Sequence, residues 1–329
     1  DEYLTITENS IIYNLSKKDK KAEIFQSLDE NKEIEIPKFI EHKSKIYKIV
    51  QINSEAFLNS TIEVFKMIND ENITISQKSF ENCISLRSII IETKGTIHIE
   101  DNNFNKIPKL KSIHIKGKNT IIDTNCFTEC FAQEQYLSQQ QPQPQNKNII
   151  IEGTNQISIG NECFKQNDLL KQIELKSKQI TVGDDCFDEC RYLSSFTISE
   201  SNEFSLGKNQ FRKCLNFQKL KLESTKIDLG IKCFSLSSLT EVDIFCEEIT
   251  INKFSVSDLL SITKFSINKS KIVVIDENAF TGCKNLKIFS AVSEQSIIVS
   301  NSCFINLESL QEILIACPSI FIDDSCFMN

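Results

Sequence analysis

A phenylalanine returns at a nearly constant interval along most of the chain, and this interval restricts the fold more than any other feature. The series is Phe57, Phe80, Phe104, Phe127, Phe164, Phe187, Phe211, Phe234, Phe254, Phe280, Phe304 and Phe327. Most intervals are 23 or 24 residues, one is 37, and the intervals of 20 and 26 on either side of Phe254 average 23. Such a period is the signature of a solenoid, in which each repeat forms one coil stacked on its neighbours.

Short apolar patterns stand at fixed distances from each phenylalanine. Seven and five residues before Phe80 come Ile73 and Ile75, and this period-two pattern predicts a short strand with one face inward. After Phe80 comes an L-x-x-I-x-I run at 86–91, which predicts a second strand. The few residues between them favour a 3₁₀ or single helical turn. The predicted fold is a β-rich repeat solenoid of about 12 coils, each of about 23 residues.

The two irregular parts of the chain have different predictions. Residues 1–49 alternate charge-rich segments with short apolar runs, so we expect an N-terminal β-hairpin cap that shields an array spanning 50–329. The long interval contains a Gln- and Pro-rich insert at 131–148. Proline prevents a helix there, so the insert is predicted to be a loop, either disordered or in contact with a partner.

Several units resemble the BspA-like type of leucine-rich repeat. The units are ENAFTGCKNLKIF (277–289), QKSFENCISLRSIII (77–91) and NSCFINLESLQEILI (301–315), and the entry segment 33–57 also resembles the start of that family's arrays. Each has a small residue before Phe, a Cys or equivalent three residues later, and then the L-x-x-I-x-I run. The family's proline after the first strand has a clear match only at Pro37. The resemblance implies a right-handed leucine-rich-repeat solenoid that binds proteins or host components, is often surface-exposed or secreted, and shares no catalytic residues.

Eleven of the thirteen cysteines follow the same period. Six stand directly before a phenylalanine of the series and five stand three residues after one, which favours small buried thiols stacked between coils. Disulfides between stacked cysteines such as Cys163 and Cys186 are a second interpretation, and a metal site at the C-F-x-E-C motifs is a third. Mostly reduced cysteines would favour a reducing compartment. The two groups are Cys126, Cys163, Cys186, Cys233, Cys303 and Cys326, and Cys83, Cys130, Cys190, Cys214 and Cys283, whereas Cys246 and Cys317 fall elsewhere.

The sequence predicts no enzyme, no cofactor and no metal. The histidines His42, His98 and His114 are isolated from any nucleophile or metal-ligand motif. The acidic pairs Asp184–Asp185 and Asp323–Asp324 precede repeat phenylalanines at equivalent positions, and we interpret them as turn residues.

Charge and hydropathy restrict the classes of partner that we expect this chain to bind. The net charge is −8 with acids and bases interleaved, and the sequence has no basic stripe of the kind that nucleic-acid binders show. No apolar run reaches the length that spans a bilayer, and the first residues do not resemble a signal peptide. We therefore expect neither nucleic-acid binding nor direct membrane insertion by this segment, and we expect an unidentified protein ligand.

One row of side chains is the predicted binding surface. In each L-x-x-I-x-I run, the residue between the last two apolar positions should point outward on the concave face. Ile90 and Ile150 on either side of His114 form the best apolar candidate patch, although scattered surface hydrophobes would look the same. The predicted function is a protein-binding or adhesion module at the cell surface or secreted; the alternative is an intracellular (cytoplasmic) scaffold. The row is Lys66, Ile90, His114, Ile150, Glu174, Thr197, Lys221 and Asp243, followed by Ser266, Ser290 and Leu314.

Overall fold

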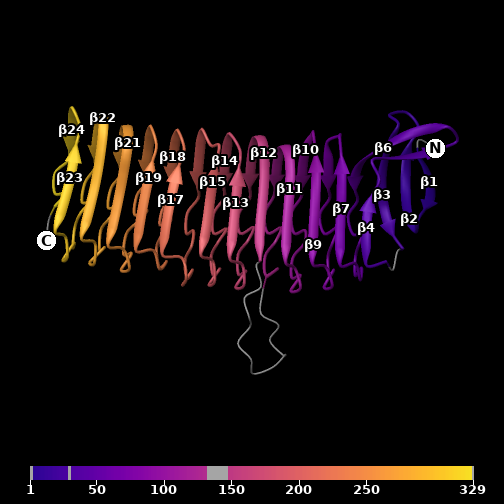
Figure 1. Ribbon diagram of the computed structural model, residues 1–329, viewed down its shortest axis with the longest axis horizontal. Helices are drawn as coiled ribbons and strands as arrows, with labels where there is room; N and C mark the ends of the chain where they lie inside the picture. The colour runs from indigo at the N-terminus through magenta and orange to yellow at the C-terminus, as the bar shows by residue number, and fades with distance from the viewer. Residues whose placement is uncertain (1–2, 29–30, 132–146, 328–329) are drawn as a thin grey trace, which may run out of the picture. The chain divides into compact units, whose positions relative to one another are not determined.

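The computed structural model describes residues 3–28, 31–131 and 147–327. The chain forms two compact units, Asp1–Leu169 and Leu170–Asn329, and each is a stack of short parallel strands (Figure 1). The two units together carry about 12 turns, as the repeat predicts. Most of the predicted insert, 132–146, lies outside the described residues.

Unit 1 contains two ladders of parallel strands joined by tight corners. The first ladder runs from β4 through β7 and β9 into the first halves of β11 and β12. The second runs from β3 through β6, β8 and β10 into their second halves. The strands are β1 (Tyr3–Glu8), β2 (Ile11–Ser16), β3 (Lys21–Ser27), β4 (Glu33–Ile36), β5 (Phe39–His42), β6 (Lys45–Ile52), β7 (Val64–Asn69), β8 (Ile73–Ile75), β9 (Ser88–Thr93), β10 (Thr96–Ile99), β11 (Ser112–Ile122) and β12 (Asn148–Ile159).

Unit 2 repeats the construction. Its strands follow in two series, β13, β15, β17 and β19, and β14, β16, β18 and β20, and the long strands β21 and β22 run through both before β23 and β24. In the first series, parallel pairing joins β13 to β15, and β17 through β19 to β21. The strands are β13 (Gln172–Lys176), β14 (Gln179–Val182), β15 (Ser195–Ser199), β16 (Glu203–Leu206), β17 (Lys219–Glu223), β18 (Lys226–Leu229), β19 (Glu241–Phe245), β20 (Glu248–Ile251), β21 (Lys264–Ile275), β22 (Ile288–Val299), β23 (Glu312–Ala316) and β24 (Ser319–Ile322).

The repeat phenylalanines form stacked columns in the core of each unit. Neighbouring rings in unit 1 are nearly parallel, with centroids 4.8 Å apart for Phe57 and Phe80 and 4.5 Å apart for Phe80 and Phe104. In unit 2 the rings of Phe187 and Phe211 stack at 5.5 Å. Apolar residues of both ladders pack around these rings, so each coil buries its apolar face only against its neighbours.

The predicted register is wrong at one coil. Phe254 belongs to the phenylalanine series, but its side chain is 38% exposed, and Val256 occupies the buried position. The backbone confirms the equivalence: Val256 N donates to Ala279 O at 2.9 Å, as Phe234 N donates to Ser255 O in the coil before. The column therefore continues through a smaller side chain.

The segments after the second strands are tight turns, and the expected 3₁₀ helix is not present in the described part of the chain. In the first such segment, Ala56 N donates to Asn53 O and Ser60 N donates to Phe57 O. Glu55 and Asn59, at the third position of these turns, have φ of 60° and 58°. Such left-handed residues interrupt a 3₁₀ helix and let alternate amides reach the next coil, as when Phe57 N donates to Ser79 O at 2.8 Å.

The N-terminal strands of unit 1 include antiparallel pairs, in the region where a β-hairpin cap was expected. Strand β2 pairs antiparallel with both β1 and β3, and β5 forms a second hairpin with β6. The predicted boundary between cap and array, at residues 49 and 50, falls inside β6. The two parallel ladders already begin at β3 and β4, since Ala22 is the register partner of Ile49 and Ile34 that of Phe65.

Candidate functional site

The predicted row in unit 1 is continuous in the structure. Lys66 is the register partner of Ile90, Ile90 that of His114, and His114 that of Ile150. Side chains of register partners in neighbouring strands lie on the same face, so the first ladder presents these four groups side by side. Ile150 is exposed, whereas Ile90, which we expected to be exposed, is half-buried.

The charges around His114 hold it between two carboxylates. His114 Nε2 lies 3.1 Å from Glu152 Oε1, and Nδ1 lies 3.8 Å from Glu92 Oε1. Lys116 Nζ approaches Glu152 Oε2 at 3.3 Å. Burial raises the pKa of Glu152, but hydrogen bonds from His114 and Lys116 outweigh it and set the pKa below its usual range. The centre of the row is therefore an imidazole in contact with two carboxylates and placed in register between two isoleucines.

The rest of the predicted row lies in unit 2 and is polar. Glu174 pairs in register with Thr197, and Lys221 with Asp243. Ser266 follows Asp243 in the ladder at the equivalent position, and its small side chain is buried. The row continues through Ser290 to Leu314, which is 53% exposed.

A groove of about 670 Å³ lies at the corners between the two ladders of unit 2. Glu200, Glu223 and Glu247 line it together with Phe245. Each carboxylate has a lysine within 4 Å, and Lys221 Nζ also lies 4.9 Å from the centroid of the Phe245 ring. The groove therefore presents charges that are already compensated within the unit.

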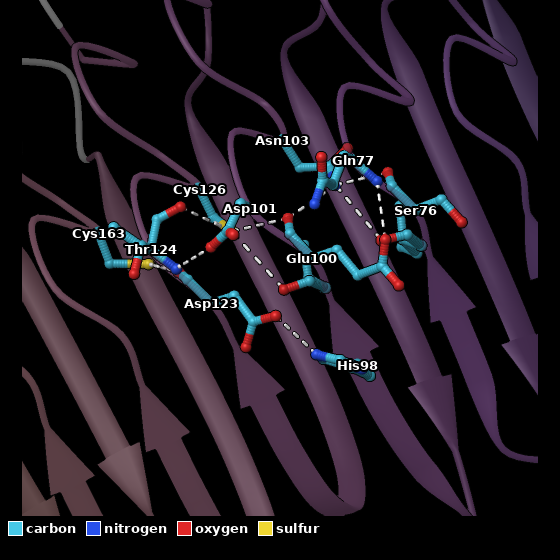
Figure 2. A network of polar contacts seen from close by, with 12 residues as sticks. Ser76, Gln77, His98, Glu100, Asp101, Asn103, Asp123, Thr124, Cys126 and Cys163 are labelled. Carbon is cyan, nitrogen blue, oxygen red and sulfur yellow. Dashed lines mark hydrogen bonds and ion pairs between the residues drawn. The ribbon is translucent and has the colours of Figure 1, made fainter.

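The acidic residues near the repeat phenylalanines are turn residues, as predicted. Asp184 Oδ1 accepts a hydrogen bond from Lys208 N of the following coil at 2.9 Å, and Asp323 Oδ1 accepts from Asp324 N at 2.8 Å. Carboxylates at these turns thus satisfy backbone amides rather than pair for catalysis. Figure 2 shows the same arrangement in unit 1, where Glu100 accepts from Gln77 N at 3.1 Å, Asp101 from Thr124 N at 2.8 Å, and Asp123 contacts His98 at 2.7 Å.

The registered cysteines form two hydrogen-bonded ladders, which the sequence analysis did not foresee. Every cysteine is present as a thiol, and twelve of the thirteen are buried, with Cys317 half-buried. A thiol three residues after a repeat ring donates to the carbonyl of the ring residue in the preceding coil. A thiol directly before a repeat ring donates to a turn carbonyl of the preceding coil. Distances are 3.1 Å for Cys83 to Phe57 O, 3.0 Å for Cys283 to Val256 O, 3.2 Å for Cys126 to Glu100 O and 3.1 Å for Cys303 to Asp276 O.

Other donors replace cysteine at the same positions. Asn167 Nδ2 donates to Phe127 O at 2.9 Å, Ser79 Oγ to Asn53 O at 2.9 Å, and Gln210 Nε2 to Gly183 O at 2.6 Å. A donor at these positions gives a turn carbonyl of the preceding coil a side-chain hydrogen bond, in addition to the backbone amide that several of these carbonyls accept, as Phe57 O accepts from Ser60 N. In the sequence, Cys, Ser, Asn or Gln at these positions is the signal that could have indicated these hydrogen bonds between coils.

Burial makes these thiols unreactive. It raises the pKa of Cys83, Cys283 and Cys303 to about 12, and that of Cys214 and Cys233 well above the ordinary value. Since the thiolate is the nucleophile and the metal ligand, a buried thiol with a raised pKa is inert.

Ion pairs between successive coils were also missed by sequence reasoning. Arg212 makes a bidentate contact with the fully buried Asp188, with Nε 2.9 Å from Oδ1. Lys253 and Glu277 form a similar pair at 3.0 Å. The partners in each pair are 24 residues apart, so opposite charges one period apart were the signal in the sequence.

Within residues 3–28, 31–131 and 147–327, no group of three or more His, Cys, Asp or Glu side chains is arranged to hold a metal ion. Over the same residues, no helix is long and apolar enough to cross a membrane.

Solved structures that match this chain over most of its length include three bacterial proteins. A leucine-rich repeat protein from Bacteroides ovatus is 18% identical, with 96% of this chain and 90% of that chain covered and a TM-score of 0.36. A leucine rich cell surface protein from Faecalibacterium prausnitzii is 17% identical, with 96% and 95% covered and a TM-score of 0.31. The pneumococcal vaccine antigen PcpA is 13% identical, with 95% and 88% covered and a TM-score of 0.25. No curated protein matches the chain.

Sequence profiles identify the repeat itself. The BspA type leucine rich repeat region matches in 6 copies, over residues 50–140, 143–250 and 204–329. These ranges cover most of the chain and coincide with the stacked coils of both units. The chain therefore belongs to the BspA-type leucine-rich-repeat family.

Proposed function

We propose that the chain is a non-enzymatic binding module whose protein ligand contacts the first ladder of unit 1. The proposal rests on the adjacency of Ile90, His114 and Ile150 on one outward face. Two apolar side chains around a polar group, with charged groups at the edge, give a partner both apolar contact and hydrogen bonds of defined direction. Ridged faces of rigid repeat arrays are also the surfaces on which such proteins bind their ligands.

The remaining residues of the predicted row have a smaller part in this proposal. Glu174, Thr197, Lys221 and Asp243 are polar and lie in unit 2, where Lys221 already contacts Phe245 and Glu223. Lys66 continues the unit 1 row but is paired with Glu35 at 2.9 Å. We therefore centre the binding site on His114 and its two neighbours.

We further propose that the module acts in adhesion at the cell surface or after secretion, as the family resemblance implies. The many cysteines do not oppose this location, because buried thiols with raised pKa values resist oxidation outside the cytosol. Labelling intact and permeabilised cells with an antibody to the chain would test it. Signal only after permeabilisation would favour the alternative, an intracellular scaffold.

The binding site is tested by replacing its apolar groups. The Ile90→Ser/Ile150→Ser variant should fold with nearly unchanged stability, within about 1 kcal/mol, yet lose at least about tenfold in affinity for the partner. The partner would be identified by affinity capture from extracellular and cell-surface extracts, and its binding measured with purified components.

The opposite ladder of the same unit offers a matched control. There His98 is the register partner of Ile121, so an outward histidine again lies beside a half-buried isoleucine. The His98→Ala/Ile121→Ser variant should bind the partner as the parent does. Equal loss of binding in both variants would place the contact elsewhere and reject the site.

A further inference from the structure

Two separate lysine-rich segments lie side by side in the N-terminal strands of unit 1. The turn between β2 and β3 contains Lys17, Lys18 and Lys20, and Lys21 begins β3. Strand β3 pairs in parallel with β6, and Lys21 is the register partner of Lys48. Lys48 N also donates to Lys20 O at 3.0 Å, which fixes the turn against β6.

The hairpin of β5 and β6 adds further lysines and two exposed apolar groups. Its two-residue turn, Lys43 and Ser44, has positive φ at both positions, as a tight hairpin requires. Phe39 is the register partner of Lys48, and Ile46 that of Glu41, so they lie on one outward face. Phe39 is 49% exposed and Ile46 is 52% exposed, whereas Ile40 and Tyr47 on the other face are buried.

The charge of this region is opposite to that of the chain. Lys38 and Lys48 have acidic partners in Asp70 and Glu71. Among the described residues, five other exposed lysines form no ion pair, and Asp19 and Glu41 are the acids that lie among them. The result is a positive surface on a chain of net charge −8. The basic hairpin patch is defined as Lys18, Lys20, Lys21, Lys43 and Lys45 together with Phe39 and Ile46.

We propose that the basic hairpin patch docks unit 1 on the surface of an anionic lipid membrane. Lysines near such a surface are attracted to acidic headgroups, and their stems accompany apolar side chains into the interface. Phe39 and Ile46 on the exposed face of a rigid hairpin supply the apolar contact. Sulfated polysaccharides and nucleic acids attract the same lysines but gain little from contact with Phe39 and Ile46. An anionic lipid surface therefore fits both the charged and the apolar groups of the patch. This docking needs no membrane-spanning segment, and it uses residues separate from the proposed protein-binding site.

The charge contribution is tested by vesicle co-sedimentation. The whole chain should bind vesicles of phosphatidylcholine with phosphatidylserine, bind vesicles of phosphatidylcholine alone much more weakly, and dissociate as salt is raised. The Lys20→Asn/Lys43→Asn/Lys45→Gln variant should bind about 100-fold more weakly, since each lysine contributes about fivefold. Asparagine suits the two positions with positive φ.

Lysines outside the patch provide the charge control. Lys111, Lys226 and Lys287 are exposed and form no ion pair within the described residues. Replacing all three with glutamine removes the same net charge and should weaken vesicle binding by less than about threefold. Equal loss in this control and in the patch variant would overturn the proposal, because the effect would then be one of net charge alone.

The apolar contribution separates lipid from other polyanions. The Phe39→Ser/Ile46→Ser variant should bind phosphatidylserine vesicles about tenfold more weakly while retaining its binding to heparin. Leu215 and Leu260, 59% and 56% exposed in unit 2, are the matched control for serine replacement. Retention on heparin together with no vesicle binding by the parent chain would overturn the proposal in favour of a polyanion ligand. Unchanged melting temperatures would establish that each variant is folded.

Discussion

Val256 and Phe254 show how the coil decides which side chain enters the core. The phenylalanine is the larger group, yet it lies at the surface and valine takes the buried position. The amide of Val256 bonds to the next coil at 2.9 Å, and this backbone register sets which Cβ points inward. Apolar size at a single position is therefore secondary to the hydrogen bonds that hold successive turns together.

Replacing Phe187 with alanine tests the importance of the ring column. The side chain is fully buried and stacks on Phe211, so its loss should lower the free energy of unfolding by about 3–5 kcal/mol. Urea unfolding followed by circular dichroism would measure this change. Phe254→Ala is the matched control and should change stability by about 0.5 kcal/mol or less. If the two variants were equally destabilised, the assignment of the column would be wrong.

At the scale of the coil, the side-chain donors connect each turn to the one before. Buried thiols such as Cys83 and Cys283 donate a hydrogen bond to a carbonyl of the preceding coil, and serine, asparagine or glutamine donates one at other coils. The parallel strands connect coils along the two ladders, and these donors connect them between the ladders. The family's preference for a small polar or thiol residue beside the ring thus has a physical cause.

The raised thiol pKa values predict a loss of stability at alkaline pH. In the unfolded chain a cysteine ionises near pH 8.5, whereas Cys83, Cys283 and Cys303 in the folded chain ionise at about 12. Their contribution is therefore fully present below pH ~8.5 and decreases as pH rises, by about 1.4 kcal/mol per pH unit for each thiol. Urea unfolding at several pH values would measure the slope.

Cys83→Ser provides the control for that slope. Serine keeps the donor, as at equivalent positions of the array, but removes the ionising group. The free energy of unfolding of this variant should decrease less steeply above pH ~8.5, and the difference in slope should equal the contribution of one thiol. A thiol reagent should also react with Cys317 first in the native chain and with the others only after denaturation. Rapid reaction of the native chain at several buried cysteines would contradict the inert-ladder interpretation.

At the scale of the whole molecule, the structure shows which residues at the ends of the predicted insert belong to the coil. Phe131 is fully buried, Asn148 begins β12, and Lys147 Nζ lies 5.8 Å from the centroid of the Phe131 ring. The ends of the predicted insert, 131 and 147–148, therefore belong to the coil. A deletion of the insert should retain them.

Deleting residues 132–146 should leave the chain folded, with a melting temperature within a few degrees of the parent. The deletion brings the long interval close to the common period, and shortening a loop changes its closure entropy by only about 0.6 kcal/mol per halving. Thermal unfolding would measure this. A deletion that also removes Phe131 should destabilise the chain by about 3 kcal/mol or more, because a large buried ring is lost. If both deletions were tolerated equally, the core assignment of Phe131 would fail.

The sequence by itself determined the fold class and most of the core. A period of 23 residues, with apolar residues at fixed distances from each phenylalanine, predicts stacked coils because one coil cannot bury its apolar face alone. The same period placed His114 beside Ile90 and Ile150, because equivalent positions of successive coils become register partners. It also placed the cysteines in the interior, although their hydrogen bonds were not foreseen.

Only the tertiary structure decided the details that depend on backbone conformation and on neighbouring coils. Tight turns form in place of the expected 3₁₀ helix because residues such as Glu55 adopt positive φ. Periodic sequence patterns do not predict positive φ at residues of this type. The burial of Val256 depends on which backbone amides bond to the next coil, and the spacing of apolar residues in the sequence does not specify those bonds. The basic hairpin patch is not visible in the sequence, because Lys21 and Lys48 become neighbours only when β3 and β6 pair.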